Sequence, residues 1–269
     1  MYGILVAFKD YQLTKGVWDS PWQNAEFYSR TFLSKAFWEV FRNTVILGSL
    51  KLVFAFPAPI ILALLLNEVR NITFKRFVQT VSYIPYFISW VVLSGIFIDI
   101  LSPSQGPVNY LLKIITGETI YFLGDPSYFR GTMVVLTIWK GIGYGAVVYL
   151  AALAGISPEL YEAAHIDGAN RWKQILHITI PSLMPVIIIL FILNIGSIVD
   201  DDFDQIFNLY NTAVYSVGDV LSTYVYRKGI GSMQYSYATI VGLFQNVLAF
   251  ILVFLTNKAA SRIGEYGIW

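Results

Sequence analysis

The sequence predicts an all-α membrane protein with five membrane-spanning helices. Hydrophobic residues make up 56% of the 269 residues and charged residues only 13%, about half the charged fraction of a typical soluble domain. Five apolar stretches are long enough to cross a hydrocarbon core, which takes about 20 residues. Because so little charge is left to cover a water-exposed surface, lipid is the solvent that the composition indicates.

Polar segments separate the five predicted spans. The spans run roughly over Phe41–Leu66, Phe77–Leu101, Thr132–Ile156, Pro181–Val199 and Tyr237–Thr256. Lys51, Pro57 and Pro59 interrupt the first span. Residues 1–35 hold no apolar run long enough to cross a bilayer. They predict an extracytoplasmic N-terminal segment before a membrane domain of residues 36–269.

Several function classes are excluded by what the sequence lacks. The net charge of +1 gives no basic field for nucleic acid. There are no cysteines for disulfides, thiolate metal sites or nucleophiles. A Walker-type loop, a zinc-protease motif and a nucleophile elbow are also absent. We therefore predict that the chain is not an enzyme and binds no cofactor of its own.

Two patterns that resemble sites have simpler explanations. The glycine-rich run Gly141–Gly145 lies inside the third span, where Gly141 and Gly145, four residues apart, favour close helix packing. His165 and His177 lie in a polar segment with no third ligand nearby in the sequence. We predict that both histidines are solvated and that no metal is bound there.

Charge density gives the orientation of the spans. Basic residues are almost equally frequent on the two sides, but the inner segments are shorter and therefore denser in charge. The positive-inside rule then places three segments in the cytoplasm. They are Asn67–Arg76, Ser157–Ile180 and the C-terminus.

The most informative segment is the polar stretch between the third and fourth spans. Ser157 suits a helix N-cap, Pro158 the first helical position and Glu159 the positive helix end. A short helix is predicted to follow, with Gly168 breaking or bending it. A second helix is predicted over Arg171–Ile180, before the next span begins.

This stretch carries a motif with fixed spacing. It reads Glu162-Ala163-Ala164, Gly168, Ile178 and Ile180-Pro181, with Asp167-Gly168-Ala169 in its centre. It resembles the cytoplasmic coupling loop of ABC importer permeases, whose pattern ends in Leu-Pro where this chain has Ile180-Pro181. The small residues would let a helix enter a groove on a partner, and Glu162 and Asp167 would pair with basic groups there. The alternative is an ordinary connector whose small residues reflect helix propensity.

The resemblance implies a set of partners in the bacterial inner membrane. The groove would belong to a dimeric cytoplasmic ATPase that holds ATP and magnesium. A second, homologous permease subunit would complete the translocation path. An extracytoplasmic solute-binding protein would deliver substrate to the outer loops Ser102–Arg130 and Phe207–Met233.

Further segments resemble one subgroup of these permeases, the maltose-type subunits for complex oligosaccharides. They are residues 1–11, 64–70, 77–80, 204–211 and 234–239. The resemblance implies a carbohydrate substrate, including acidic polysaccharides of the alginate or pectin type. Members of this family usually have one more span before the position of Met1, so a sixth span is expected there. The alternative is a subunit with only five spans.

Polar and aromatic residues in or near the spans are candidates for the substrate pathway. They are Lys51, Trp90, Trp139, Lys140, Tyr144, Tyr149, Asn194, Ser197, Gln245 and Asn246. The lysines would meet acidic sugars or, alternatively, a neighbouring acid or backbone carbonyl. The amides and Ser197 would bond sugar hydroxyls or join helices. The aromatic rings would stack on sugars or anchor the spans at the membrane interface.

An acidic cluster follows the fourth span. It consists of Asp200, Asp201, Asp202 and Asp204. Several carboxylates could bind calcium, but the twelve-residue calcium-loop pattern is absent. A solvated loop or cavity wall is the prediction.

Two other functions fit a multi-span chain. An ion-coupled secondary transporter would show paired broken helices near the middle of the membrane. Pro57 and Pro59 could break one helix, but no corresponding second half is visible. A non-transporting membrane scaffold would bind an ATPase and move nothing.

Overall fold

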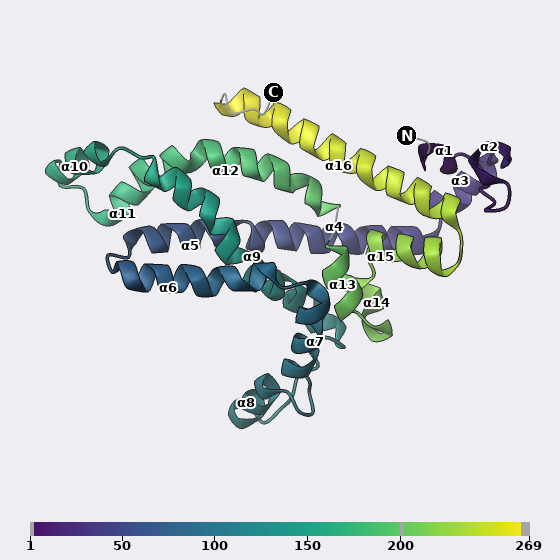
Figure 1. The fold of residues 1–269 in the computed structure, drawn as a ribbon, viewed down its shortest axis with the longest axis horizontal. Helices are drawn as coiled ribbons and strands as arrows, with labels where there is room; N and C mark the ends of the chain where they lie inside the picture. Colours follow the sequence, from purple (N-terminus) through teal and green to yellow (C-terminus); the bar gives the residue numbers. More distant parts are fainter. Residues whose placement is uncertain (1–2, 200–201, 265–269) are drawn as a thin grey trace. The chain divides into compact units, whose positions relative to one another are not determined.

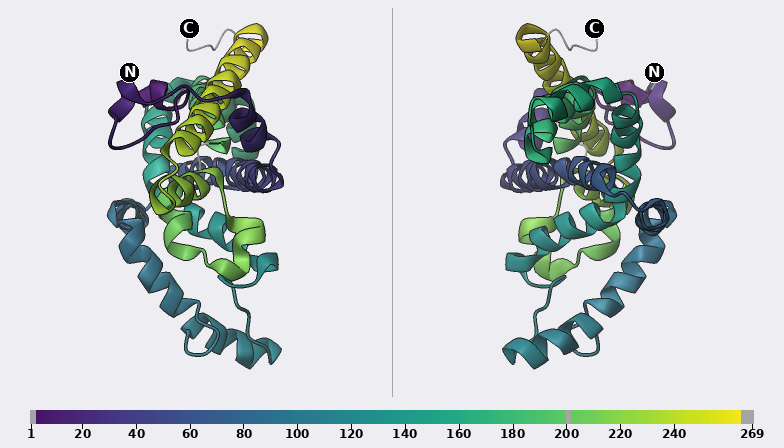
Figure 2. Two further views of the ribbon diagram at one scale, coloured as in Figure 1. Left: turned by 90° about the vertical axis from the view of Figure 1, so that its right-hand side faces the viewer. Right: turned by 90° about the vertical axis from the view of Figure 1, so that its left-hand side faces the viewer.

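The computed structural model describes residues 3–199 and 202–264, and among these residues it contains helices and no β-strand (Figure 1). Two isolated bridges, Lys9–Trp22 and Gln12–Gly16, close the N-terminal turns. The views in Figure 2 show the same helical architecture from both ends. The all-α prediction is confirmed.

The helices have the following bounds. Before and through the first span they are α1 (Gly3–Val6), α2 (Gly16–Asp19), α3 (Ala25–Phe32), α4 (Lys35–Ala55) and α5 (Pro57–Glu68). Next come α6 (Ile72–Tyr83), the 3₁₀ turn Ile84–Phe87, α7 (Trp90–Ile100), α8 (Pro107–Thr116) and α9 (Pro126–Ala154). The central polar segment forms α10 (Pro158–Ile166), α11 (Arg171–Gln174) and a π-helical turn, Ile175–Thr179. The last elements are α12 (Ile180–Ile195), a 3₁₀ turn Gly196–Ile198, α13 (Phe203–Leu209), a 3₁₀ turn Thr212–Val214, α14 (Tyr215–Gly218), α15 (Leu221–Tyr226), a π-helical turn Arg227–Gly231 and α16 (Tyr235–Gly264).

Four described helices are long and apolar enough to cross a membrane. They are Lys35–Glu68, Pro126–Ala154, Arg171–Ile198 and Tyr235–Arg262. These confirm the first, third, fourth and fifth predicted spans. At most 33% of the residues in their most apolar windows are buried within the chain. Most of this apolar surface is therefore not covered by the described part of the chain itself.

The second predicted span is wrong as a single helix. The chain forms a bent pair here, Ile72–Phe87 and Trp90–Ile100, which is either a broken span or a re-entrant segment. Pro85 lies in the 3₁₀ turn that ends the first half, and proline cannot donate a helical hydrogen bond. Ser89 then caps α7 by accepting the backbone N–H of Val92 at 3.4 Å. The sequence stays apolar across this break, so hydropathy alone did not predict it.

The chain divides into two compact units. Unit 1 holds residues 1–51, 89–134 and 196–252, and unit 2 holds residues 52–88, 135–195 and 253–269. A core cluster of unit 1 joins α4, α15 and α16 through Phe37, Leu221 and Val241. A core cluster of unit 2 joins α5, α9 and α12 through Ala63 and Leu183, with Tyr149 buried among them. Tyr149 is therefore a packing residue.

Glycines allow close packing within unit 2. A side chain at Gly143 would collide with the carbonyl of Ser82 on α6, and one at Gly145 would press on Pro59 of α5. Gly141 meets nothing within 4 Å. The packing explanation of the glycine run is confirmed for Gly145, while Gly143 rather than Gly141 makes the second contact.

Candidate functional site

The first helix of the predicted coupling loop begins as its sequence indicates. Ser157 accepts the backbone N–H of Glu159 at 3.3 Å and so caps α10. Pro158 occupies the first turn, where a missing N–H costs nothing. Glu159 lies beside the positive end of the helix. The N-terminal boundary of α10 is thus fixed by three consecutive residues.

The same helix ends in a glycine-dependent turn. Gly168 has φ +75°, a left-handed conformation that other residues adopt at a cost. Its N–H donates to the carbonyl of His165 at 3.1 Å, and the N–H of Ala169 donates to Ala164 at 2.8 Å. This pair of bonds is a Schellman motif, which satisfies the last carbonyls of the helix. The predicted break at Gly168 is confirmed.

The second predicted helix is not a separate element. Asn170 caps α11 by accepting the backbone N–H of Lys173 at 2.9 Å. α11 then passes through a π-helical turn directly into α12, so Arg171–Ile198 counts as one long helix. Pro181 has no N–H for the carbonyl of His177, and we attribute the π turn to this missing bond.

Two side-chain contacts hold the loop in place. The amide of Gln174, which is 6% exposed, donates to the carbonyl of Ala169 at 3.1 Å. The hydroxyls of Tyr161 on α10 and Thr179 on the π turn lie 3.0 Å apart. Since both contacts link α10 or its end to the long helix, a force on the loop would reach α12.

The tip of the loop is exposed. Five of the eight predicted ATPase-coupling residues are exposed, and three are half-buried. The exposed ones are Glu162, Ala163, Asp167, Gly168 and, at the start of α12, Pro181. The half-buried ones are Ala164, Ala169 and Ile178.

Sequence reasoning missed the large apolar residues of this tip. Ile166 is 87% exposed, Trp172 is 73% exposed and Leu160 is 50% exposed. Large apolar side chains gathered on a polar loop are typical of an interaction surface. Their presence in an otherwise hydrophilic segment was the available signal. The two predicted solvated histidines, His165 and His177, are exposed.

Lys140 supports the break in the second span. Its Nζ donates to the carbonyls of Tyr86 at 3.1 Å and Ile88 at 2.6 Å. These are the bonds to backbone carbonyls that formed one alternative for this residue. One turn later, Tyr144 is 44% exposed and stacks on Tyr86, with ring centroids 3.9 Å apart.

Two other pathway candidates in unit 2 are exposed. Trp139 is 45% exposed. Asn194 is exposed, and its amide donates to the carbonyl of Leu190, one turn back on α12, at 2.8 Å. Trp139, Tyr144 and Asn194 are thus the exposed pathway candidates of unit 2.

The candidates in unit 1 are mostly engaged in internal contacts. Trp90, 7% exposed, donates from Nε1 to the carboxylate of Asp202 at 2.8 Å. Gln245, 9% exposed, donates to the carbonyl of Val199 at 2.6 Å. Asn246 is exposed, while Lys51 is half-buried on α4. Ser197 is exposed on the 3₁₀ turn before the undescribed residues.

The acidic cluster is only partly described. Asp200 and Asp201 lie outside the described residues. Asp202 accepts the Trp90 hydrogen bond, and Asp204 is exposed on α13. Within residues 3–199 and 202–264, no three His, Cys, Asp or Glu side chains gather as a metal site would require.

A polar cluster in unit 1 was not foreseen from the sequence. Asn43 of α4 is 1% exposed, and its amide donates to the carbonyls of Ser216 at 3.1 Å and Asp219 at 3.2 Å. Its carbonyl oxygen accepts Nη2 of Arg130 at 2.8 Å, and Nε of Arg130 donates to Val217 at 3.1 Å. Asn43 thus ties α4, α9 and α14 together.

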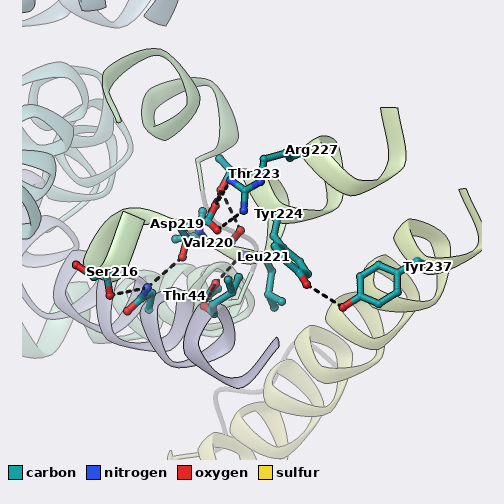
Figure 3. Close-up of polar contacts among 11 residues, drawn as sticks. Thr44, Ser216, Asp219, Val220, Leu221, Thr223, Tyr224, Arg227 and Tyr237 are labelled. Atoms are coloured by element: carbon teal, nitrogen blue, oxygen red, sulfur yellow. Dashed lines mark hydrogen bonds and ion pairs between the residues drawn. The ribbon is translucent and has the colours of Figure 1, made fainter. Parts of the chain in front are cut away.

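An ion pair completes this cluster. Arg227 donates to both carboxylate oxygens of Asp219, at 3.1 and 2.6 Å, and Thr223 donates to one of them at 2.9 Å (Figure 3). The Asp219 side chain is 7% exposed and that of Arg227 36%. The bond to Asp219 raises the pKa of Arg227 above its usual range. Leu221 and Thr44 add a backbone-to-hydroxyl bond of 2.8 Å.

Comparison with known proteins places this fold and these motifs in context. The sequence profile of one family, the binding-protein-dependent transport system inner membrane component, matches residues 55–263. Protein LplB of Bacillus subtilis (strain 168) is 44% identical over 100% of this chain and 85% of its own. The polygalacturonan/rhamnogalacturonan transport system permease protein YteP of the same strain is 41% identical over 100% and 84%.

Two solved structures have a very similar fold. A bacterial ABC transporter involved in the import of the acidic polysaccharide alginate is 39% identical, with a TM-score of 0.90 over 97% of this chain and 88% of its own. A bacterial alginate ABC transporter in complex with an alginate pentasaccharide-bound periplasmic protein is also 39% identical. Its TM-score is 0.91 over 99% of this chain and 88% of its own.

Proposed function

Because this chain belongs to the family of binding-protein-dependent transport system inner membrane components, and is a multi-pass permease subunit of an ABC importer, we propose that its cargo is an oligosaccharide, including acidic polysaccharide fragments of the alginate or pectin type. The substrates printed for its relatives support this cargo: polygalacturonan and rhamnogalacturonan for YteP, alginate for the solved transporters.

The exposed tip of α10 docks in a groove of a cytoplasmic ATPase. Small residues around Gly168 allow close approach, and Ile166 and Trp172 supply apolar contact that nothing within the described part of the chain covers. This surface is the observation that carries the proposal. ATP and magnesium belong to the ATPase, since the chain has no phosphate-binding loop.

Movement of the loop reaches the membrane through one continuous helix. The contacts of Gln174 with Ala169 and of Tyr161 with Thr179 join the tip to α12. A π turn is a frequent feature of functional sites in helices. ATP-driven closure of the ATPase would displace α10 and, through these contacts, rock α12.

Two further partners complete the importer. A second, homologous permease subunit lies against the extensive apolar surfaces of the spans and closes the translocation path. A solute-binding protein delivers sugar to the outer loops, and one solved relative in complex with its periplasmic protein supports this role. Exposed Tyr144, Trp139 and Asn194 contact sugar rings and hydroxyls along the path.

Uptake in proteoliposomes tests the function. The chain is reconstituted with its partner permease, ATPase and binding protein, and uptake of labelled trigalacturonate is measured with and without ATP on the ATPase side. We expect uptake only with ATP. Uptake driven by an ion gradient without ATP would identify a secondary transporter, and ATPase binding with no uptake of any offered sugar would identify a scaffold.

A further inference from the structure

A small pocket opens beside the polar cluster of unit 1. Its volume is about 280 Å³, and α4, α14 and α15 form its walls. Arg42 and Asn43 line it from α4, Tyr215 from α14, and Tyr224 and Arg227 from α15 and the following turn. Ligand pockets usually start at about 300 Å³, so this one has room for one end of a sugar residue.

The charged groups around the pocket favour an anion. Its acidic residues already have partners: Asp219 is paired with Arg227, and Glu39 lies 3.7 Å from Lys35. The Glu39 contact is weak, because the two side chains are 54% and 91% exposed. Arg42 is exposed at the pocket wall. The lining thus holds two carboxylates and two guanidiniums, and among the described residues Arg42 is the lining arginine that forms no ion pair.

A third arginine, Arg130, adds positive charge near Arg42. Arg130 donates to the Asn43 side chain and to the carbonyl of Val217, both of which are neutral acceptors. Arg42 is close enough to Arg130 to repel it electrostatically. In the part of the chain that the structure describes, neither Arg42 nor Arg130 forms an ion pair. A bound anion near Arg42 would offset the repulsion between these two arginines.

Aromatic rings shape the rest of the pocket. The guanidinium of Arg227 lies 4.8 Å from the ring centroid of Tyr215 and 5.7 Å from that of Tyr224. These contacts and the Asp219 pair hold Arg227 in one orientation. A planar guanidinium held in this way can present its remaining N–H groups to a carboxylate, while the half-buried ring of Tyr215 contacts a sugar ring.

We propose that this pocket is a carboxylate-binding subsite on the outer side of the membrane, where Arg42 and Arg227 receive a uronate carboxylate of an acidic oligosaccharide entering the transporter. The location follows from α4, which begins directly after the predicted extracytoplasmic segment of residues 1–35. This inference rests on the proposed function. It adds a determinant that distinguishes acidic from neutral sugars.

The experiment compares two sugars that differ only in charge. Proteoliposomes of zwitterionic lipid contain the complete importer, with this chain as wild type, Arg42→Gln, Arg42→Lys or Arg30→Gln. Uptake of trigalacturonate is measured against uptake of the same trisaccharide after its carboxyl groups are reduced to alcohols. Arg30→Gln is the matched control, because it removes the same charge from the extracytoplasmic segment, at a residue paired with Glu26 and away from the pocket.

Arg42→Gln is expected to lower trigalacturonate uptake about tenfold, the loss typical of one charge-assisted contact. Uptake of the neutral sugar should stay unchanged, Arg42→Lys should retain part of the acidic uptake, and Arg30→Gln should transport both sugars like wild type. Equal loss of both sugars would overturn the proposal, since Arg42 would then serve folding or partner docking. No loss of either sugar would overturn it as well.

Two further outcomes separate this proposal from others. If the Arg42→Gln effect appears only when phosphatidylglycerol is added, the anion is a lipid phosphate and the proposal is wrong. If wild type transports the neutral sugar with ATP but never trigalacturonate, the result supports the importer function and contradicts the carboxylate subsite. If wild type transports neither sugar with ATP, the proposed cargo itself fails.

Discussion

The predicted coupling loop and the polar cluster of unit 1 are built in opposite ways. In the loop, contacts join near neighbours: Ser157 with Glu159, Gly168 with His165, and Asn170 with Lys173. In the cluster, contacts join distant segments: Asn43 is 87 positions from Arg130 and 176 from Asp219. The loop is a local structure with an exposed tip, and the cluster is a long-range structure with a buried centre.

This difference predicts that substitutions in the two regions affect different measured properties. A local loop can lose its docking surface and still leave the spans folded, because few contacts with the rest of the chain depend on its tip. A buried network that ties α4, α9 and α14 together cannot lose a member without exposing unpaired polar groups. Changes in the loop should therefore alter transport, and changes in the cluster should alter the melting temperature.

The largest effect is expected at Gly168. Gly168→Asp forces a side chain onto a residue with φ +75° and puts bulk and charge into the ATPase groove. We expect ATP-driven uptake to be abolished while the amount of protein in the membrane is unchanged, as measured by immunoblot and vesicle uptake.

Gly16 provides the matched control. It has φ +70° at the start of α2 and, like Gly168, nothing within 4 Å of an added Cβ. Gly16→Asp therefore brings a similar backbone strain, of about 1–2 kcal/mol, far along the chain from the coupling motif and outside the two predicted outer loops. It should still transport. If both variants lose uptake equally, backbone strain rather than a blocked docking surface explains the loss of uptake in Gly168→Asp.

A smaller effect, on stability, is expected at the ion pair of the cluster. Asp219→Asn leaves the charge of Arg227 without its carboxylate. Removing one partner of a fully buried pair costs about 3–5 kcal/mol, and the 36% exposure of the Arg227 side chain reduces this. We expect about 2 kcal/mol, or a melting temperature roughly 5 °C lower in detergent.

The exposed pair of Arg30 and Glu26 is the comparison for this loss. Its side chains are 78% and 62% exposed, and such pairs contribute about 0–1 kcal/mol. Glu26→Gln should shift the melting temperature by about 2.5 °C at most. Equal shifts for Asp219→Asn and Glu26→Gln would show that the cluster does not stabilise the fold.

The same contrast explains what could be predicted from the sequence. Ser157, Pro158 and Gly168 act through neighbouring residues, so their pattern predicted the boundaries of α10 correctly. The break after Pro85 was missed because hydropathy continues through it, while the supporting bonds come from Lys140, more than 50 positions away. Asn43 looked like an ordinary polar residue at the edge of a span, since its partners appear only in three dimensions.

An intermediate effect on docking is expected at Ile166. Its side chain is 87% exposed and would be buried against the ATPase, where an apolar side chain contributes about 1.5–3 kcal/mol. Ile166→Ser should weaken binding of the purified ATPase roughly tenfold and leave the melting temperature unchanged. Leu33→Ser, at 79% exposure on the predicted outer segment, should leave ATPase binding unaffected. Equal binding by the two variants would contradict a role of this tip in docking.

The smallest effect is expected at Tyr144, which tests whether the aromatic surface of unit 2 meets sugar. Tyr144→Ala removes a ring that stacks on Tyr86, and a ring contact contributes about 0.5–1.5 kcal/mol. We expect uptake to fall about threefold at low sugar concentration and to recover at high concentration, because the ring affects affinity. Tyr128 has the same 44% exposure but packs against Phe122 in unit 1. Tyr128→Ala should change the melting temperature without altering the concentration dependence of uptake, whereas equal concentration dependence in both variants would place Tyr144 among packing residues.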